Sequence, residues 1–115
     1  MATWKLTIRH GSDVSRERFD DLDQALGAAR KAAAEVIAEG PLDSVSAFRD
    51  YGPSDQVNAR IEITGKGLFK PPTAGIDIRG DLSIVPYAGG VRREAMEGAN
   101  IAQAIKSLKM FLDHA

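Results

Sequence analysis

Apolar and polar residues alternate strictly from Gln56 to Thr64, with every odd position apolar and every even position polar. This two-residue period is typical of a β-strand with one dry face and one solvated face. A shorter alternation places Trp4, Leu6 and Ile8 on one side of the chain and predicts a first strand there. Both patterns indicate a sheet that has a core on one side only.

The first predicted strand is followed by turn-forming residues at Gly11–Asp13. The next segment, Val14–Phe19, alternates weakly and is interpreted as a second strand, with a loop as the alternative. The chain is therefore expected to open with a β-hairpin.

Two segments carry apolar residues at the three- and four-residue spacing of an amphipathic helix. The first is expected to begin at the N-cap Asp20, beside Phe19, and to end at Gly40 and Pro41. The second is expected to begin at the N-cap Asn100. The apolar stripes comprise Leu22, Ala25, Leu26, Ala29, Ala33, Val36 and Ile37 in the first helix, and Ile101, Ala104, Ile105, Leu108, Phe111 and Leu112 in the second.

The region between the helices predicts further strands. Residues 44–50 alternate weakly, whereas Gly65–Thr73 contains glycines and a proline pair and is expected to be a surface loop. Residues 75–79 and 82–85 flank the Gly80-Asp81 turn and predict a hairpin whose register is open by one residue.

The end of this region is less regular. Pro86 indicates a strand end or a sheet edge, because proline cannot donate to a ladder. Val91–Glu97 is interpreted as a last strand, with the first turn of the final helix as the alternative.

These elements predict one α+β domain spanning residues 1–115, in the order strand, strand, helix, strands, helix. Short turns favour a mainly antiparallel sheet of about five to seven strands. Both helices are one-sided, so we expect them on one face of the sheet, with the other face open to water.

Composition narrows the function. The chain has no cysteine, which excludes disulfides, thiol nucleophiles and cysteine-based metal sites. Its net charge of −1 lacks the basic excess of a dedicated nucleic-acid binder. Nothing near Met1 is typical of a signal peptide, and no apolar run approaches a membrane span, so we expect a cytoplasmic protein without membrane contact.

Candidate catalytic groups are sparse. His10 and His114 each stand alone, so we expect neither a metal site nor a cofactor. On single strands, Glu62 lies near Arg60 and Asp77 near Arg79, and such pairs are typical of solvated ion pairs. No apolar pocket that would separate the acidities of two carboxyl groups is evident, which disfavours an enzyme.

The open sheet face is the most defensible binding surface. Basic residues along it would suit phosphate contact, although base stacking would require exposed aromatic side chains, for which only Tyr51 and Tyr87 are plausible. The candidate residues for binding a partner or nucleic acid are Lys5, Arg9, Asn58, Arg60 and Arg79.

Self-association is a second expectation. Leu68 and Phe69 are large apolar residues in the expected surface loop, where they would either return to the core or dock on a second copy. A sheet edge near Pro86 offers another contact, so we expect a homo-oligomer, most simply a dimer.

Five segments carry a resemblance: Trp4-Lys5-Leu6, Val14, Arg16–Asp20, Ala25-Leu26 and Gly75–Asp81. Through them the chain resembles a family of small bacterial single-domain proteins with no assigned function, which supplies no catalytic residues to transfer. The element order is also similar to that of double-stranded-RNA-binding and ribosome-associated domains. The basic helix start of those domains has no counterpart here, since Asn100–Gln103 carries no charge.

The sequence favours a non-catalytic interaction domain that self-associates and binds another macromolecule, such as a protein, through its open sheet face. Nucleic-acid binding through the basic residues of that face is an alternative. A small-ligand binding protein or a small enzyme is a third hypothesis.

Overall fold

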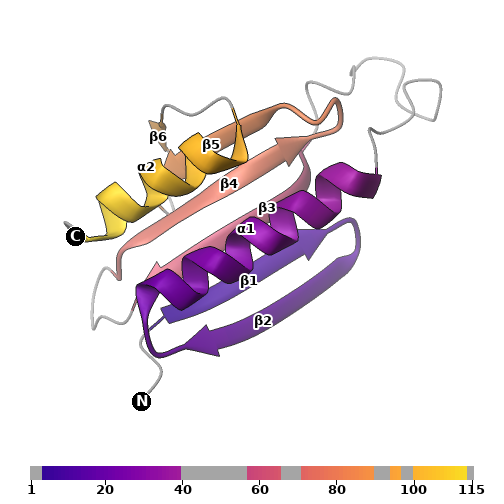
Figure 1. Ribbon diagram of the computed structural model, residues 1–115. Helices are drawn as coiled ribbons and strands as arrows, with labels where there is room; N and C mark the ends of the chain where they lie inside the picture. The colour runs from indigo at the N-terminus through magenta and orange to yellow at the C-terminus, as the bar shows by residue number, and fades with distance from the viewer. Residues whose placement is uncertain (1–3, 40–56, 66–70, 90–93, 97–99, 114–115) are drawn as a thin grey trace.

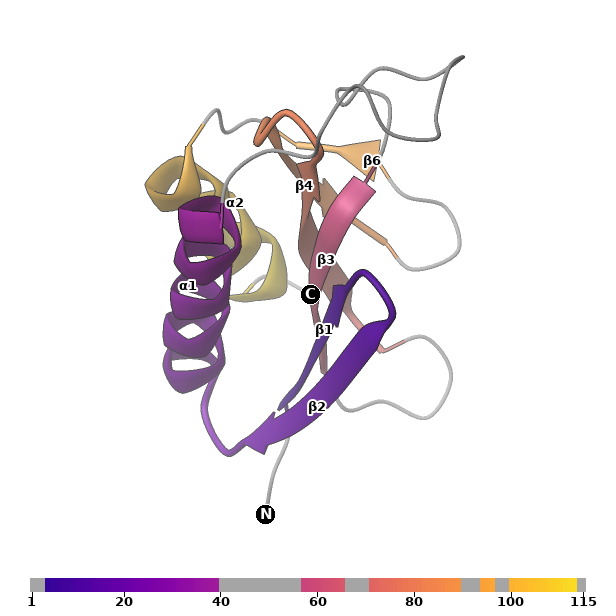
Figure 2. The ribbon, with the colours of Figure 1, turned by 90° about the vertical axis from the view of Figure 1, so that its right-hand side faces the viewer.

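The computed structural model describes residues 4–39, 57–65, 71–89, 94–96 and 100–113. Two helices lie on one face of an antiparallel sheet (Figure 1 and Figure 2). The helices are α1 (Leu22–Glu39) and α2 (Ile101–Asp113). The strands are β1 (Trp4–His10), β2 (Asp13–Phe19), β3 (Val57–Gly65), β4 (Thr73–Arg79), β5 (Ile84–Ala88) and β6 (Glu94–Ala95).

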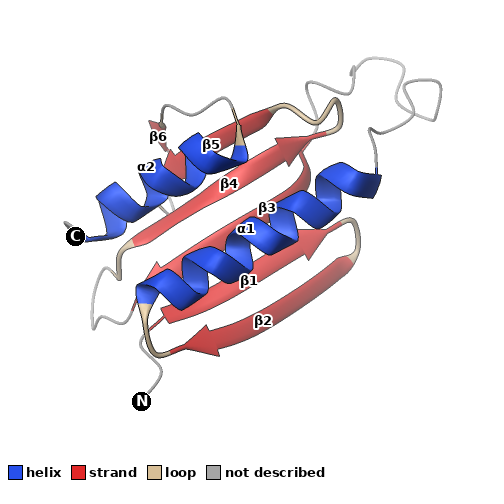
Figure 3. Ribbon diagram, viewed as in Figure 1, coloured by secondary structure: helices blue, strands red, loops and turns tan. Residues whose placement is uncertain are grey.

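The strand order across the sheet is β2-β1-β3-β4-β5-β6, and every pair is antiparallel (Figure 3). Five strands are five to nine residues long, and β6 adds two residues at one edge. The predicted α+β class, the antiparallel sheet and the opening hairpin are thereby confirmed. We call the face turned away from α1 and α2 the open face.

The strict alternation has the expected structural meaning. In β3 the side chains of Ala59, Ile61 and Ile63 are fully buried against the helical layer, whereas Arg60 and Glu62 lie on the open face. A bulge between positions 57 and 59 interrupts the register at the start of the strand. The buried residues of β3 form one core with those of β4 and both helices.

The cap of α1 differs from the expectation. Oδ1 of Asp21, and not of Asp20, accepts a hydrogen bond of 3.0 Å from the backbone N–H of Gln24. The prediction of Asp20 was wrong because two adjacent aspartates can each serve as a cap, and the helix begins one residue later at Leu22. Alanines along the buried stripe, such as Ala29 and Ala33, let α1 lie close to the sheet.

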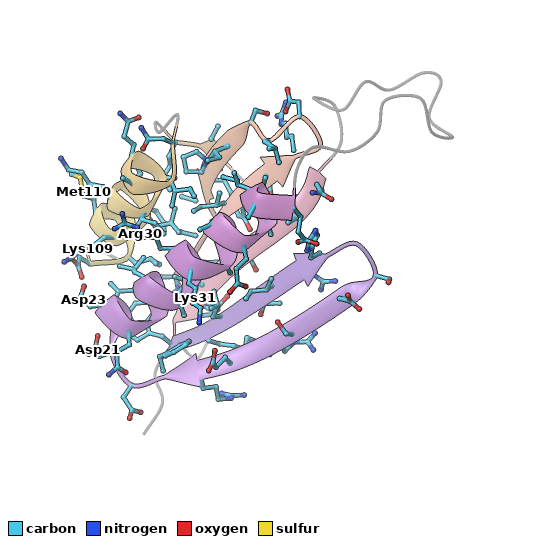
Figure 4. The ribbon with its side chains drawn as sticks, turned by 45° about the vertical axis from the view of Figure 1, so that its right-hand side comes forward. Asp21, Asp23, Arg30, Lys31, Lys109 and Met110 are labelled. Carbon is cyan, nitrogen blue, oxygen red and sulfur yellow. The ribbon has the colours of Figure 1, made fainter. Side chains whose placement is uncertain are left out.

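The cap of α2 is confirmed: Oδ1 of Asn100 accepts a 2.9 Å hydrogen bond from the backbone N–H of Gln103. Phe111 departs from the expected stripe, since it is 37% exposed at the edge of the buried line. The two helices contact each other through an ion pair between Lys109 Nζ and Asp23 Oδ1 at 3.2 Å (Figure 4).

The β4–β5 connection is a hairpin whose loop is longer than the two-residue turn predicted. Ile78 pairs with Ile84, so Leu82 and Ser83 belong to the loop and not to the second strand. Leu82 has a φ of 69°, the left-handed conformation that this loop requires. Asp81 Oδ1 accepts hydrogen bonds from the backbone N–H and hydroxyl of Ser83, which lower the pKa of Asp81.

Pro86 lies buried inside β5, so the prediction that it ends a strand was wrong. Its carbonyl accepts a 2.7 Å hydrogen bond from the backbone N–H of Met96 on the β6 side. The N–H and C=O of one residue point the same way in an antiparallel strand, so the donor that proline lacks would also have faced β6. Pro86 therefore lies one strand in from the edge of the sheet, which β6 forms, so the expectation of a sheet edge at Pro86 is not confirmed.

Other predicted elements are only partly covered. Within Val91–Glu97 the structure shows a strand at Glu94–Ala95, which supports the strand interpretation for those two residues. The weak strand at 44–50, and Leu68 and Phe69, lie outside the described residues.

Candidate functional site

The strand register brings basic residues of β1, β2 and β3 together on the open face. Arg9 of β1 lies directly opposite Arg60 of β3. Thr7 lies between Arg16 of β2 and Glu62 of β3. The neighbouring row continues with Lys5, which is paired with Arg18 of β2 and Thr64 of β3.

These side chains surround a polar concavity of about 210 Å³, which we call the basic hollow. It contains four cations and one acid, so its local charge is positive although the whole chain carries −1. Its lining residues are Lys5, Thr7, Arg9, Arg16, Arg60, Glu62 and Thr64.

One wall of the basic hollow is held by an ion pair. Arg60 Nε lies 2.6 Å from Asp77 Oδ1, and its Nη2 lies 3.1 Å from Oδ2, so the contact is bidentate. Only 26% of the Arg60 side chain and 16% of the Asp77 side chain are exposed. The hydrogen bond to Asp77 raises the pKa of Arg60 above its usual value, outweighing the opposing effect of burial. Arg60 is therefore fixed in position and always charged.

A buried tyrosine supports the same wall. The hydroxyl of Tyr87 on β5 donates a 2.5 Å hydrogen bond to Glu62 Oε2 on β3, and β4 lies between these two strands. The ring can cross because the intervening residue is Gly75: a Cβ there would lie 2.5 Å from the Tyr87 hydroxyl and 2.6 Å from the Ile61 carbonyl oxygen. The guanidinium carbon of Arg60 lies 5.6 Å from the centre of the ring, within cation–π range.

Burial and the hydrogen bond to Glu62, in that order, raise the pKa of Tyr87 well above its usual value of 10.0. The residue is 2% exposed. The prediction that Tyr87 could be an exposed stacking aromatic was therefore wrong. Tyr51, the other candidate, lies outside the described residues.

The predicted binding residues separate into two groups. Lys5, Arg9 and Arg60 line the basic hollow together. Asn58 joins Arg9 and Arg60 in an adjacent hollow of about 210 Å³ near the β1–β2 turn. Arg79, at the end of β4, lines neither of them, so the structure does not bring it to the same place.

Sequence analysis missed Arg16 and misjudged the partners of Arg60 and Glu62. Arg16 lies on β2, whose weak alternation left its outward face unassigned. The expected pairing of Arg60 with Glu62 along β3 is replaced by cross-strand contacts, since Arg60 binds Asp77 and Glu62 binds Tyr87. These contacts depend on the β3–β4 register, which no local pattern predicts, and on the β4–β5 register, which was open by one residue.

The two histidines lie outside the basic hollow or outside the described residues. His10 Nδ1 lies 3.3 Å from Glu39 Oε2 at the end of α1, and His114 lies outside the described residues. In the described part of the chain, no group of three or more potential ligand side chains is placed to hold a metal ion. No helix of that part is long and apolar enough to cross a membrane.

Comparison with known proteins adds no family to this picture. No protein-family model matches the chain, and neither a curated protein nor a solved structure shows a significant match.

Proposed function

We propose that this chain is a non-catalytic interaction domain that binds an acidic macromolecule through its open sheet face. The observation that carries the proposal is the basic hollow, where four cations from three strands surround one concavity. Cations held on a rigid sheet attract anionic partners from a distance and orient them on contact.

The arrangement of the acids favours binding over catalysis. Glu62 and Asp77 are the carboxylates in and beside the basic hollow, and both accept hydrogen bonds from neighbouring side chains. A general acid or base must exchange a proton with substrate in the site. The contacts of Glu62 and Asp77 instead hold Arg60 and Tyr87 in place, which suits a preorganised binding surface.

Nucleic-acid binding is a second candidate, since the same cations suit phosphate groups. Tyr87 is the only aromatic residue among the described residues of the open face, and it is buried beneath Arg60. Recognition of single-stranded nucleic acid usually adds stacking on exposed aromatic side chains. We therefore rank an acidic polypeptide above a nucleic acid as the partner.

Fluorescence anisotropy tests the proposal, with labelled poly-L-glutamate and a labelled single-stranded oligonucleotide as separate probes. Titrations at about 0.05 M and about 0.15 M salt should show weaker binding at the higher salt, because screening increases. The Arg16→Glu variant should bind at least about tenfold more weakly, a difference of about 1.4 kcal/mol. Light scattering on the same samples tests the expected self-association, which predicts a mass above 12.4 kDa.

The matched control is Arg30→Glu, which makes the same charge change on α1 in the helical layer (Figure 4). It should leave the affinity unchanged if binding takes place on the open face. Failure of both probes to bind at low salt, or equal losses in the two variants, would refute the proposal.

A further inference from the structure

We propose that the outer edge of β2 receives an extended acidic segment of the partner as an additional antiparallel strand. The inference rests on the proposed function and names the form in which the acidic partner binds.

β2 is the terminal strand of the sheet, with β1 on its inner side. Every residue from Asp13 to Arg18 is exposed, so the described helices leave both faces of the strand accessible. A terminal strand of this length presents a row of backbone donors and acceptors, which is the template used when an extended peptide adds to a sheet.

The hydrogen-bond phase shows which backbone groups point outward. The backbone N–H of Gly11 donates a 3.4 Å hydrogen bond to the carbonyl of Asn58, so this N–H points toward β3. The direction of the backbone N–H and C=O groups alternates from residue to residue along a strand, so those of His10 point toward β2. Asp13 is paired with His10, and its backbone groups therefore point toward β1. The alternate residues of β2 then direct their N–H and C=O groups away from β1; these residues are Val14, Arg16 and Arg18.

The same residues carry side chains on the open face. Arg16 lies beside Thr7 at the basic hollow, and Arg18 lies beside Lys5. In an antiparallel pair, directly opposed residues share a face and their side chains are close. Each partner residue that bonds to Arg16 or Arg18 would therefore place its own side chain beside a cation. Alternating carboxylates on the incoming strand match this arrangement.

A second copy of the chain fits this edge poorly. Pairing β2 with β2 around a two-fold axis must oppose residues of the same face. Centred on Ser15, the pairing opposes Asp13 and Glu17, and centred on Arg16, Glu17 or Arg18 it opposes two copies of that charged residue. Centred on Val14, it overlaps only the three residues Asp13–Ser15 of each strand. Like charges directly opposite destabilise a strand pair, so charge complementarity selects an acidic partner and not another β2.

The test uses an eight-residue peptide that alternates glutamate and threonine, with both ends blocked, and two N-methylated forms. N-methylation removes the backbone donor and blocks close pairing at that position. In antiparallel addition the glutamates bond to β2, so methylating every glutamate nitrogen should weaken binding by at least about tenfold. Methylating every threonine nitrogen, which faces away from β2, should leave the dissociation constant within about twofold of the parent peptide.

Three outcomes would overturn the inference. Equal effects of the two methylation patterns would show that the peptide binds without strand pairing, and failure of the parent peptide to bind at low salt would exclude the acidic strand. Tight binding of the oligonucleotide alone would assign the basic hollow to nucleic acid. The proposed function is refuted by different results. Poly-L-glutamate and the oligonucleotide would both have to show no binding, or Arg16→Glu and Arg30→Glu would have to lose affinity equally.

Discussion

Gly75 should be the least replaceable glycine among those whose surroundings the structure describes. A methyl group added there would lie 2.5 Å from the Tyr87 hydroxyl and 2.7 Å from its ring carbon. It would also lie 2.6 Å from the Ile61 carbonyl oxygen, which belongs to the backbone of β3 and cannot rotate away. Gly75→Ala therefore forces either the ring of Tyr87 or the β3–β4 pairing to move.

The cost can be worked from these contacts. Normal separations between heavy atoms are about 3.5–4.0 Å, so the new methyl group is about 1 Å too close on two sides. Overpacking of this kind costs about 1–3 kcal/mol, and losing the Tyr87–Glu62 hydrogen bond costs about 1 kcal/mol more. Replacing glycine in a strand returns about 0.5–1 kcal/mol through reduced chain entropy. We expect a net loss of about 1–3.5 kcal/mol.

Urea unfolding followed by circular dichroism measures this loss. The control is Gly27→Ala on α1, where an added Cβ meets nothing within 4 Å. That variant should gain up to about 1 kcal/mol, because alanine is the better helix former. If Gly75→Ala were as stable as the unmodified protein, the close crossing of Tyr87 over Gly75 would be refuted.

Two further predictions concern stability. Burial and the hydrogen bond to Glu62 raise the pKa of Tyr87 above 10.0, so the folded state holds the hydroxyl proton more tightly than the unfolded state. The resulting stabilisation of the folded state is complete below about pH 10 and falls by up to about 1.4 kcal/mol per pH unit above about pH 10. Tyr87→Phe should therefore lose less stability than the unmodified protein between about pH 8 and about pH 11 in urea unfolding, and equal losses would contradict this. Asn100→Ala should cost about 1 kcal/mol by removing the cap of α2, whereas Asn100→Asp should retain most of it; equal midpoints of thermal unfolding for the two variants would count against the capping role.

Local patterns predicted the elements well where one side chain decides the outcome. The alternation in β3 identified Ala59, Ile61 and Ile63 as core residues, and Asn100 identified the start of α2. Asp20 and Asp21 both satisfy the local rule for an N-cap, so the sequence could not distinguish them. Only the packed position of α1 distinguishes them, and it makes Asp21 the residue that accepts the hydrogen bond from Gln24.

The candidate site depends on pairings that no local pattern contains. Arg9 and Arg60 are neighbours only because β1 pairs with β3 in one particular register. Arg16 joins them through the register of the first hairpin, and Asp77 through that of β4. The contact of Tyr87 with Glu62 passes over Gly75 on the strand between them, which the sequence pattern presented as an ordinary strand residue.

The β1–β3 ladder also has a kinetic consequence. In the part of the chain that the structure describes, the other ladders join strands that follow one another in sequence, whereas β2 and α1 lie between β1 and β3. Arg9 and Arg60 lie roughly fifty positions apart, so their pairing closes a long loop before its contacts can compensate for the lost chain entropy. The hairpin with α1 and the later strands with α2 can each form locally, so we expect the joining of β1 to β3 to limit the folding rate.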